Sequence, residues 1–505
     1  MRKMRSWAAG TLLGLAVSAG ATDSAQSTSS QQPAAGLNLI NHIIFLAQEN
    51  RSFDHYFGEM RHYWAQNGYS DRSFDGLPQF NPQTGDAPLY GPPPTNPGCD
   101  PAFPPPDDCA VDAASPTITS YHLKTQCTEN TSPSWNEAHV DWDLNDPVGK
   151  NPAQLNGFVY AAAHDARAVK FHDKSGRRAM GYYRGTDLNY YYFMASNFAT
   201  SDRWFNPVMS RTHPNREYLI AATSRGYVYP IGTDFHDRNL LAARTIFQEL
   251  QAAGDTWKIY VNPTNSGCSG PPYAASCLLG LSYVQNFQWG QTIPSDYPQN
   301  LGTIGITNSD FENDLANGTL PNVAQIEPAT DAGLDEHPSN SDAIPSEVQP
   351  GAKYVAGIIN AVMASPYWKD TVFVLTYDEF GGLFDHVSPQ PAVSPDGIKP
   401  KDLLSGDICT TTSGPTCDFV YTGYRVPLIV ISPYSKRHYI SHTVADSTAI
   451  LKLIETRFHL KPLTQRDKAQ MDMTEFFDFG NPPWMTPPVP PEQSTSDACY
   501  LNKLP

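Results

Sequence analysis

Three short, almost uninterrupted apolar runs constrain the fold of this chain more than any other feature of its sequence. They read HIIFLAQ at residues 42–48, TVFVLTY at 371–377 and VPLIVIS at 426–432. Runs this short and this rich in β-branched residues are typical of strands that are buried on both faces. Apolar residues also recur with a helical period at 351–364 and 448–458. This alternation predicts an α/β fold with a mostly parallel central sheet and helices on both faces.

The expected elements extend along most of the 505 residues without a clear linker. A shorter run, WKIYV at 257–261, adds another expected strand. We therefore expect one large domain at 37–480 with long loop insertions, followed by a proline-rich tail at 481–505. Proline (45) and glycine (35) are plentiful while charged residues make up only 17%, which is typical of a loop-rich globular protein.

The N-terminus has the pattern of an export signal. Basic residues at positions 2, 3 and 5 precede an apolar stretch at 7–17, and Ala19-Gly20-Ala21 follows as a small-residue cleavage site. We predict a signal peptide at 1–21, a disordered tether at 22–36, and export to the periplasm or the medium. An uncleaved anchor is the alternative, but it needs a longer apolar run. No later segment reaches the ~18 uninterrupted apolar residues of a membrane-spanning helix.

Eight cysteines fit an exported chain, because an even number in an oxidising compartment indicates disulfides. Proximity in the sequence favours three close couples, each spanning one loop, and leaves the last two cysteines for each other. The expected pairs are Cys99–Cys109, Cys268–Cys277, Cys409–Cys417 and Cys127–Cys499. A zinc site is not expected, because the sequence contains no CxxC pair.

The charge balance narrows the range of partners. Aspartate and glutamate number 51 against 34 lysines and arginines, which gives a formal net charge of −17. A surface of this sign repels the phosphates of nucleic acids and of anionic lipids. We therefore expect no nucleic acid and no anionic membrane as the main partner, whereas a zwitterionic choline lipid is compatible with this charge.

Oxygen-bearing side chains follow two of the expected strands. Glu49 and Asn50 come directly after 42–48, and Asp378 and Glu379 come directly after 371–377. Ligands of α/β sheets bind beyond the carboxyl ends of the strands, so these four groups can meet at one edge. They would repel each other unless a cation lay between them, which predicts a metal site. The alternative is that they are solvated loop carboxylates, helix caps or salt-bridge partners.

Thr212 is the candidate nucleophile. It opens the segment Thr212-His213-Pro214-Asn215-Arg216, which precedes an expected helix at 217–222, and Pro214 suits a helix start. A hydroxyl at this turn would face the positive end of the helix, where a phosphate oxyanion is stabilised. A metal could lower the pKa of that hydroxyl. The alternative is that Thr212 only caps the helix.

Three histidines are candidates for the general acid that protonates a leaving oxygen near neutral pH. His337 lies in a polar loop ahead of the helix at 351–364, His386 follows soon after Glu379, and His139 lies four residues after Trp135. Each of them could instead be a loop histidine whose hydrogen bonds are satisfied internally. We interpret His55 and His122 as structural.

These residues form an ordered series of motifs that resembles the bacterial phosphoesterase family, which holds the non-zinc phospholipases C and related acid phosphatases. The resemblance covers residues 39–479. Its motifs are ENRSFDHYFG at 49–58, THPNR at 212–216, DEHP at 335–338, YDE at 377–379 followed by two glycines, and FDHV at 384–387. Two positions depart from the family pattern: Pro133 and Phe380 stand where many members have histidine. Either His139 takes over the role of the missing histidine before Ser134, or that role is lost.

The resemblance implies an alkaline-phosphatase-like α/β three-layer sandwich. It also implies Thr212 as nucleophile, His337 as a site histidine, and a divalent metal held by Glu49, Asn50, Asp378 and Glu379. Oxygen ligands favour Ca²⁺, Mg²⁺ or Mn²⁺.

The predicted function is hydrolysis of phosphoric esters in two steps, through a phosphothreonine. The substrate is a phosphate monoester or a phospholipid head group, and the sequence does not decide between phospholipase C and acid phosphatase. A sulfatase is disfavoured, because oxidation of Thr212 would give a ketone instead of the aldehyde that sulfatases need. A non-catalytic binding protein on the same scaffold is the alternative from another class. The oligomeric state is not predicted.

Overall fold

An eight-stranded sheet forms the centre of the computed structural model, which describes residues 36–504 except 84, 86, 106–107, 232–238 and 341–346. Strand β12 runs antiparallel to both of its neighbours, and the other pairings in the sheet are parallel. This confirms the predicted mostly parallel sheet. In spatial order the strands are β13 (Tyr439–Ser441), β6 (Ala199–Ser201), β12 (Leu428–Ile431), β11 (Thr371–Tyr377), β1 (His42–Gln48), β10 (Val323–Ile326), β8 (Trp257–Val261) and β9 (Leu301–Thr303).

The predicted apolar runs occupy the middle of this sheet. β1, β8 and β11 have the predicted bounds, and β12 is shorter than the predicted 426–432. Every residue of β11 is buried, as are the last six residues of β1. The register pairs His42 with Thr371 and Gln48 with Tyr377, so the two strands end side by side. The polar residues that follow them therefore leave the sheet at the same edge.

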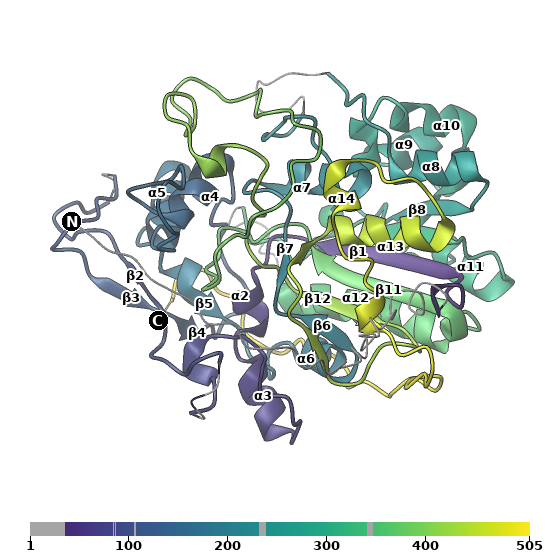
Figure 1. Ribbon diagram of the computed structural model, residues 1–505, viewed down its shortest axis with the longest axis horizontal. Helices are drawn as coiled ribbons and strands as arrows, with labels where there is room; N and C mark the ends of the chain where they lie inside the picture. The colour runs from purple at the N-terminus through teal and green to yellow at the C-terminus, as the bar shows by residue number, and fades with distance from the viewer. Residues whose placement is uncertain are drawn as a thin grey trace, which may run out of the picture.

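Helices cover both faces of the sheet (Figure 1), which confirms the predicted three-layer α/β sandwich. Helix α12 begins three residues before the predicted 351–364, and it buries Val355, Ile359 and Val362 at helical spacing. The helices of one layer, which contact one another, are α7 (Thr212–Ala221), α8 (Ile246–Ala253) and α13 (Thr448–Phe458). Those of the other layer are α6 (Asn189–Asn197), α11 (Asp310–Asn317) and α12 (Val348–Ala364).

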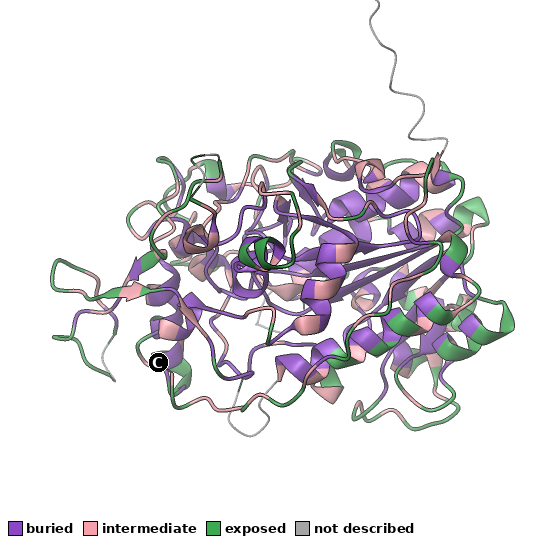
Figure 2. Cartoon of the chain, turned by 90° about the horizontal axis from the view of Figure 1, so that it is seen from below, coloured by how far each residue is buried: buried purple, intermediate pink, exposed green. Residues whose placement is uncertain are grey.

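The remaining elements lie around this sandwich, and the most buried residues run through its strands (Figure 2). Three pairs of short strands stand apart from the main sheet: β2 (Thr95–Pro97) with β3 (Thr117–Thr119), β4 (Tyr121–His122) with β5 (Gly181–Tyr182), and β7 (Trp204–Phe205) with β14 (Ala445–Asp446). The other helices are α2 (Phe53–Phe57), α3 (Met60–Gln66), α4 (Trp135–Trp142), α5 (Phe158–Val169), α9 (Ala275–Gly280), α10 (Ile293–Asp296) and α14 (Gln465–Lys468).

Four disulfides join the cysteine pairs that sequence proximity predicted, and this prediction is confirmed. The predicted signal peptide and all of the tether except Gly36 lie outside the described residues. Residues 481–504, predicted as a tail, lie against the domain: the Trp368 indole donates to the carbonyl of Trp484, and Cys499 is bonded to Cys127. Within the described part of the chain, no helix combines the length and the apolar character that crossing a membrane requires.

Candidate active site

The four predicted metal ligands lie together at the carboxyl ends of β1 and β11. Glu49, Asn50, Asp378 and Glu379 are all buried, with 4% or less of their surface exposed. Asp378 Oδ1 accepts hydrogen bonds from the backbone N–H groups of Asn50 (3.0 Å) and Glu379 (2.8 Å). The paired strand ends thus set the spacing of the four side chains, as the sequence predicted.

After Glu379 the chain makes a tight turn, and this turn packs closely against the loop that contains Asn50. Gly381 has a φ of +72°, and a Cβ there would lie 2.3 Å from the carbonyl oxygen of Asn50. Only glycine tolerates both the left-handed backbone and this approach. The Gly381 N–H donates to Glu379 Oε2 (2.6 Å) and so orients that carboxylate. Phe380, which replaces the family histidine, is buried against Tyr424.

Thr212 is the first residue of α7, and its hydroxyl faces the carboxylate cluster. The hydroxyl oxygen lies 3.2 Å from Glu49 Oε2 and 3.5 Å from Asn50 Oδ1. The helix begins at Thr212, earlier than the predicted 217–222, and Arg211 occupies the capping position, so Thr212 does not cap the helix. The hydroxyl therefore lies at the positive end of a ten-residue helix and next to two candidate metal ligands.

Arg216 is a site residue to which the sequence analysis assigned no role. It lies four residues after Thr212, hence on the same face of α7, and this spacing is the signal that could have revealed it. Its buried guanidinium binds Glu49 Oε1 (2.8 Å) and Asp378 Oδ2 (3.2 Å). Burial alone would raise the pKa of Glu49, but the charge of Arg216, assisted by that of His337, holds it below its ordinary value.

Arg216 does not compensate all of the negative charge around the other two carboxyl groups of the cluster, Asp378 and Glu379. Burial and the charge of Glu49 raise the pKa of Asp378 well above its ordinary value, and burial and the charge of Asp378 do the same for Glu379. Glu379 Oε1 is buried without a hydrogen-bond partner in the described part of the chain. Three carboxylates and an amide oxygen form a donor set that suits a hard divalent cation, which would relieve this repulsion. The residues present therefore fit the predicted metal.

His337 lies beside this cluster in a loop that is bonded to the end of β1. The Glu49 N–H donates to the carbonyl of Asp335 (3.0 Å), and the His337 N–H donates to Asp335 Oδ1 (3.2 Å). The His337 ring is partly buried, and its charge acts on Glu49. The structure therefore brings His337 to the same site as Thr212.

His139 lies on α4 and is not among the residues that the Thr212 hydroxyl contacts. It is fully buried, and its two ring nitrogens face the backbone carbonyls of Trp135 (2.6 Å) and Thr416 (3.0 Å). Burial lowers the pKa of His139 to about 4. These contacts occupy both nitrogens, so the ring has no nitrogen directed at a substrate.

His386 belongs to a separate network of charges. Its Nδ1 lies 2.6 Å from Asp54 Oδ2 and its Nε2 lies 3.2 Å from Asp75 Oδ1. Asp54, Asp385 and His386 place potential ligand atoms within 4.8 Å of one another, a second acidic cluster compatible with a cation. However, the buried Arg425 already pairs with Asp54 (3.1 Å) and Asp385 (2.8 Å).

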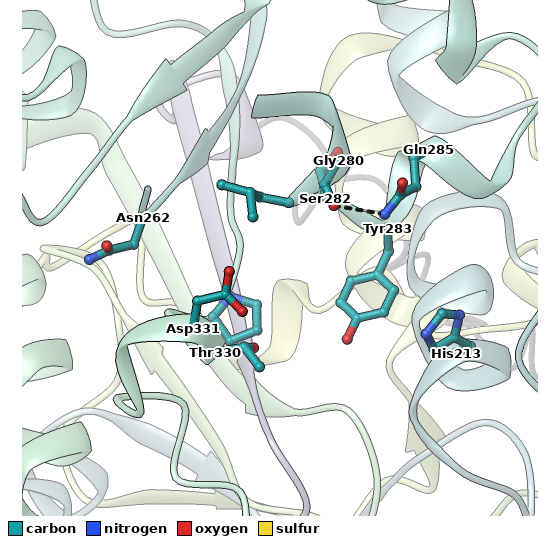
Figure 3. Close-up of a pocket in the computed structure, with 10 residues that line it drawn as sticks. His213, Asn262, Gly280, Ser282, Tyr283, Gln285, Thr330 and Asp331 are labelled. Atoms are coloured by element: carbon teal, nitrogen blue, oxygen red, sulfur yellow. Dashed lines mark hydrogen bonds between the residues drawn. The ribbon is translucent and has the colours of Figure 1, made fainter. Parts of the chain in front are cut away.

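A pocket of about 180 Å³ adjoins the carboxylate cluster. Figure 3 shows His213 and Tyr283 next to each other along one side, with Thr330 and Asp331 across from them. The Tyr283 hydroxyl lies 3.4 Å from Glu49 Oε1, so the pocket opens beside the candidate catalytic groups. Tyr283 lies in a segment without any recognisable motif, and the sequence therefore offered no signal for it.

Comparisons with known proteins show the family of this chain. The Phosphoesterase family model matches residues 40–461. Phospholipase C B of Mycobacterium tuberculosis is 30% identical, over 93% of this chain and 82% of its own length. A non-hemolytic phospholipase C of Pseudomonas aeruginosa is 27% identical, over 93% of this chain and 61% of its own length. Among solved structures, murine ectonucleotide pyrophosphatase/phosphodiesterase 5 is 12% identical with a TM-score of 0.31, covering 58% of this chain and 95% of that one. The chain belongs to the Phosphoesterase family and is a hydrolase that acts on phosphoric esters.

Proposed function

We propose that this chain is an exported, metal-dependent phosphoric ester hydrolase of the phospholipase C type that works through a phosphothreonine at Thr212. The observation that carries the proposal is the position of the Thr212 hydroxyl, at the start of α7 and within 3.5 Å of both Glu49 and Asn50. The resemblance to named phospholipases C supports a phospholipid head group as substrate. Four disulfides support export.

Glu49, Asn50, Asp378 and Glu379 would hold the cation. A divalent ion bound there would stabilise the charge that develops on the phosphoryl oxygens and favour ionisation of a neighbouring hydroxyl.

In the first step, the Thr212 hydroxyl gives its proton to Glu49 Oε2, to which it is hydrogen-bonded, and Thr212 Oγ attacks phosphorus from the side opposite the leaving alcohol. A P–Oγ bond forms and the P–O bond to the alcohol breaks. His337 gives its proton to the departing oxygen. In the second step, water attacks the phosphothreonine, the P–Oγ bond breaks, and Glu49 returns the proton to Thr212 Oγ. His337 takes a proton from that water, which restores Thr212 and releases the phosphorylated head group.

A paired assay tests the substrate class. The purified mature protein is offered p-nitrophenyl phosphorylcholine and p-nitrophenyl phosphate, before and after chelation and after return of Mn²⁺, Mg²⁺ or Ca²⁺. We expect cleavage of the phosphorylcholine ester that chelation removes and a metal restores. Preference for the monoester would indicate an acid phosphatase, and inactivity on both with metal present would favour a binding protein.

The nucleophile has its own test. Thr212→Ala is expected to lower kcat by at least about a thousandfold while the protein retains its metal, because only the attacking oxygen is lost. Thr212→Ser is the matched control and is expected to retain most of the activity. Rapid quenching followed by mass spectrometry is expected to find one phosphoryl group on the peptide that contains Thr212. Full activity of Thr212→Ala would contradict the proposal.

A further inference from the structure

Glu336 is a buried carboxylate for which the proposed reaction has no use. It lies between Asp335 and His337, has no exposed surface, and adopts a φ of +68°. Each of its carboxylate oxygens accepts two hydrogen bonds. The donors to Oε1 are Tyr191 (2.5 Å) and Gln48 (3.2 Å), and those to Oε2 are Tyr56 (2.6 Å) and Tyr377 (2.8 Å). A carboxylate offers about four acceptor positions, so all of them are occupied.

Two of these donors end the two central strands. Gln48 is the last residue of β1, Tyr377 is the last residue of β11, and the register pairs them. They directly precede Glu49 and Asp378, which Arg216 binds from α7. The other two donors come from α2 and α6. The strand ends that carry the candidate metal ligands are therefore held by Arg216 from α7 and by Glu336 from the loop that precedes α12.

The same residue also anchors its own loop. The buried guanidinium of Arg51 donates from Nε to the carbonyl of Glu336 (2.9 Å). Helix α12 leaves room for the side chain at Gly351, where a Cβ would lie 2.4 Å from Glu336 Cγ. One residue earlier, the carbonyl of Asp335 accepts from Glu49. The loop that carries His337 is thus fixed against the end of β1.

We propose that Glu336 is a positioning residue, whose carboxylate fixes the ends of β1 and β11 together with the His337 loop and so sets the spacing of the candidate metal ligands. The inference rests on the proposed function, because it concerns the site proposed there. Glu336 acts through Gln48 and Tyr377 and does not touch the substrate. Removal of one of its four donors is expected to make the positions of the metal ligands less fixed. The metal affinity should then fall by about 10–100-fold, as it does when a residue that hydrogen-bonds a metal ligand is removed.

Adjacent tyrosines on α6 provide a matched test. Tyr190 and Tyr191 are both buried and both donate a hydroxyl hydrogen bond, Tyr190 to Asn360 (3.0 Å) and Tyr191 to Glu336. Tyr191→Phe should lower stability more than Tyr190→Phe, because Tyr191 donates to a buried carboxylate whereas Asn360 is exposed. Only Tyr191→Phe is expected to weaken Mn²⁺ binding, by about tenfold in titration calorimetry, and to lower kcat with KM nearly unchanged. Tyr377→Phe is expected to do the same.

The outcomes separate the two proposals. If Tyr191→Phe and Tyr377→Phe lose stability but keep the Mn²⁺ affinity and kcat of the wild type, Glu336 is structural only and the inference is overturned. In that case the proposed function still stands, because the wild type binds the metal and turns over. If the wild type binds no divalent cation, both proposals fall together.

Discussion

At the scale of single residues, Glu379 gives the clearest test of metal binding, since one of its oxygens is buried without a hydrogen-bond partner in the described part of the chain. Glu379→Gln keeps the shape and removes one negative charge. We expect Mn²⁺ affinity, measured by titration calorimetry, to fall by more than about tenfold. Glu455→Gln is the control, because Glu455 is a buried carboxyl on α13 that belongs to no candidate site. Equal affinities for Glu379→Gln and the wild type would exclude Glu379 as a ligand.

His386 predicts a pH dependence of stability. Burial would lower its pKa, but Asp54 and Asp75 raise it to about 9, above the ordinary 6.5, against the charge of Arg425. A raised pKa in the folded state means that the stabilisation is complete below about pH 6.5 and is lost as the pH rises through about 9. The difference corresponds to about 3 kcal/mol.

The measurement is the Tm of the wild type and of His386→Gln between pH 6 and pH 9.5. We expect the wild type to lose stability over this range and the variant to lose much less. Parallel curves would show that His386 is not the responsible group. The activity of His386→Gln tests the predicted catalytic role of His386. Its observed contacts do not indicate that role.

The sequence identified the side chains that directly follow the strands, but it did not identify the residues that hold these side chains in place. Glu49, Asn50, Asp378 and Glu379 could be predicted because parallel strands end at a common edge. Arg216 and Glu336 belong to motifs that the sequence shows, but their roles could not be predicted, because those roles depend on partners from other parts of the fold. Tyr191 had no signal at all, because its hydroxyl reaches Glu336 across 145 residues of sequence.

At the scale of elements, the turn after β11 can be tested at Gly381. Gly381→Ala places a Cβ 2.3 Å from the Asn50 carbonyl at a φ of +72°. We expect a loss of at least about 1–2 kcal/mol from the backbone alone, together with weaker metal binding, because Asn50 must move. Gly357→Ala on α12 is the control, since its Cβ meets nothing within 4 Å. That control should gain about 0.4–1 kcal/mol. Denaturant unfolding compares the two, and a neutral Gly381→Ala would contradict this account of the turn.

Long apolar elements were predictable and short ones were not. β1, β8 and β11 have their predicted bounds because runs of five to seven mostly apolar residues leave little choice. β6 and β9 contain three residues each, too few for any periodicity. α7 begins earlier than predicted, because proline is most frequent at the first helical position whereas Pro214 lies at the third position of α7.

At the scale of the whole molecule, the candidate site joins segments that are far apart in the chain. Glu49 lies 163 residues from Thr212, with which it shares a hydrogen bond, and the backbone of Asn50 lies 328 residues from Asp378. Such contacts depend on how strands are ordered across the sheet, and that order cannot be deduced from local patterns. The family resemblance implied that Thr212 and the metal ligands share one site, and for that it needed no derivation of the strand order.

The disulfide Cys127–Cys499 closes the longest covalent loop, with a sequence separation of 372. It ties the C-terminal segment to the domain, where the Gln126 N–H also donates to the carbonyl of Ala498 (2.9 Å). The matched control is Cys268–Cys277, with a separation of 9. Cross-linking restricts the unfolded chain more when the loop is longer, and the two separations differ by roughly five doublings, or about 3 kcal/mol.

We therefore expect Cys127→Ser/Cys499→Ser to lose about 3 kcal/mol more in urea unfolding than Cys268→Ser/Cys277→Ser. After reduction, both variants and the wild type should have the same free energy of unfolding, because none of them then contains a disulfide. Equal losses for the two double variants would mean that the bond at Cys127 does not restrict the unfolded chain.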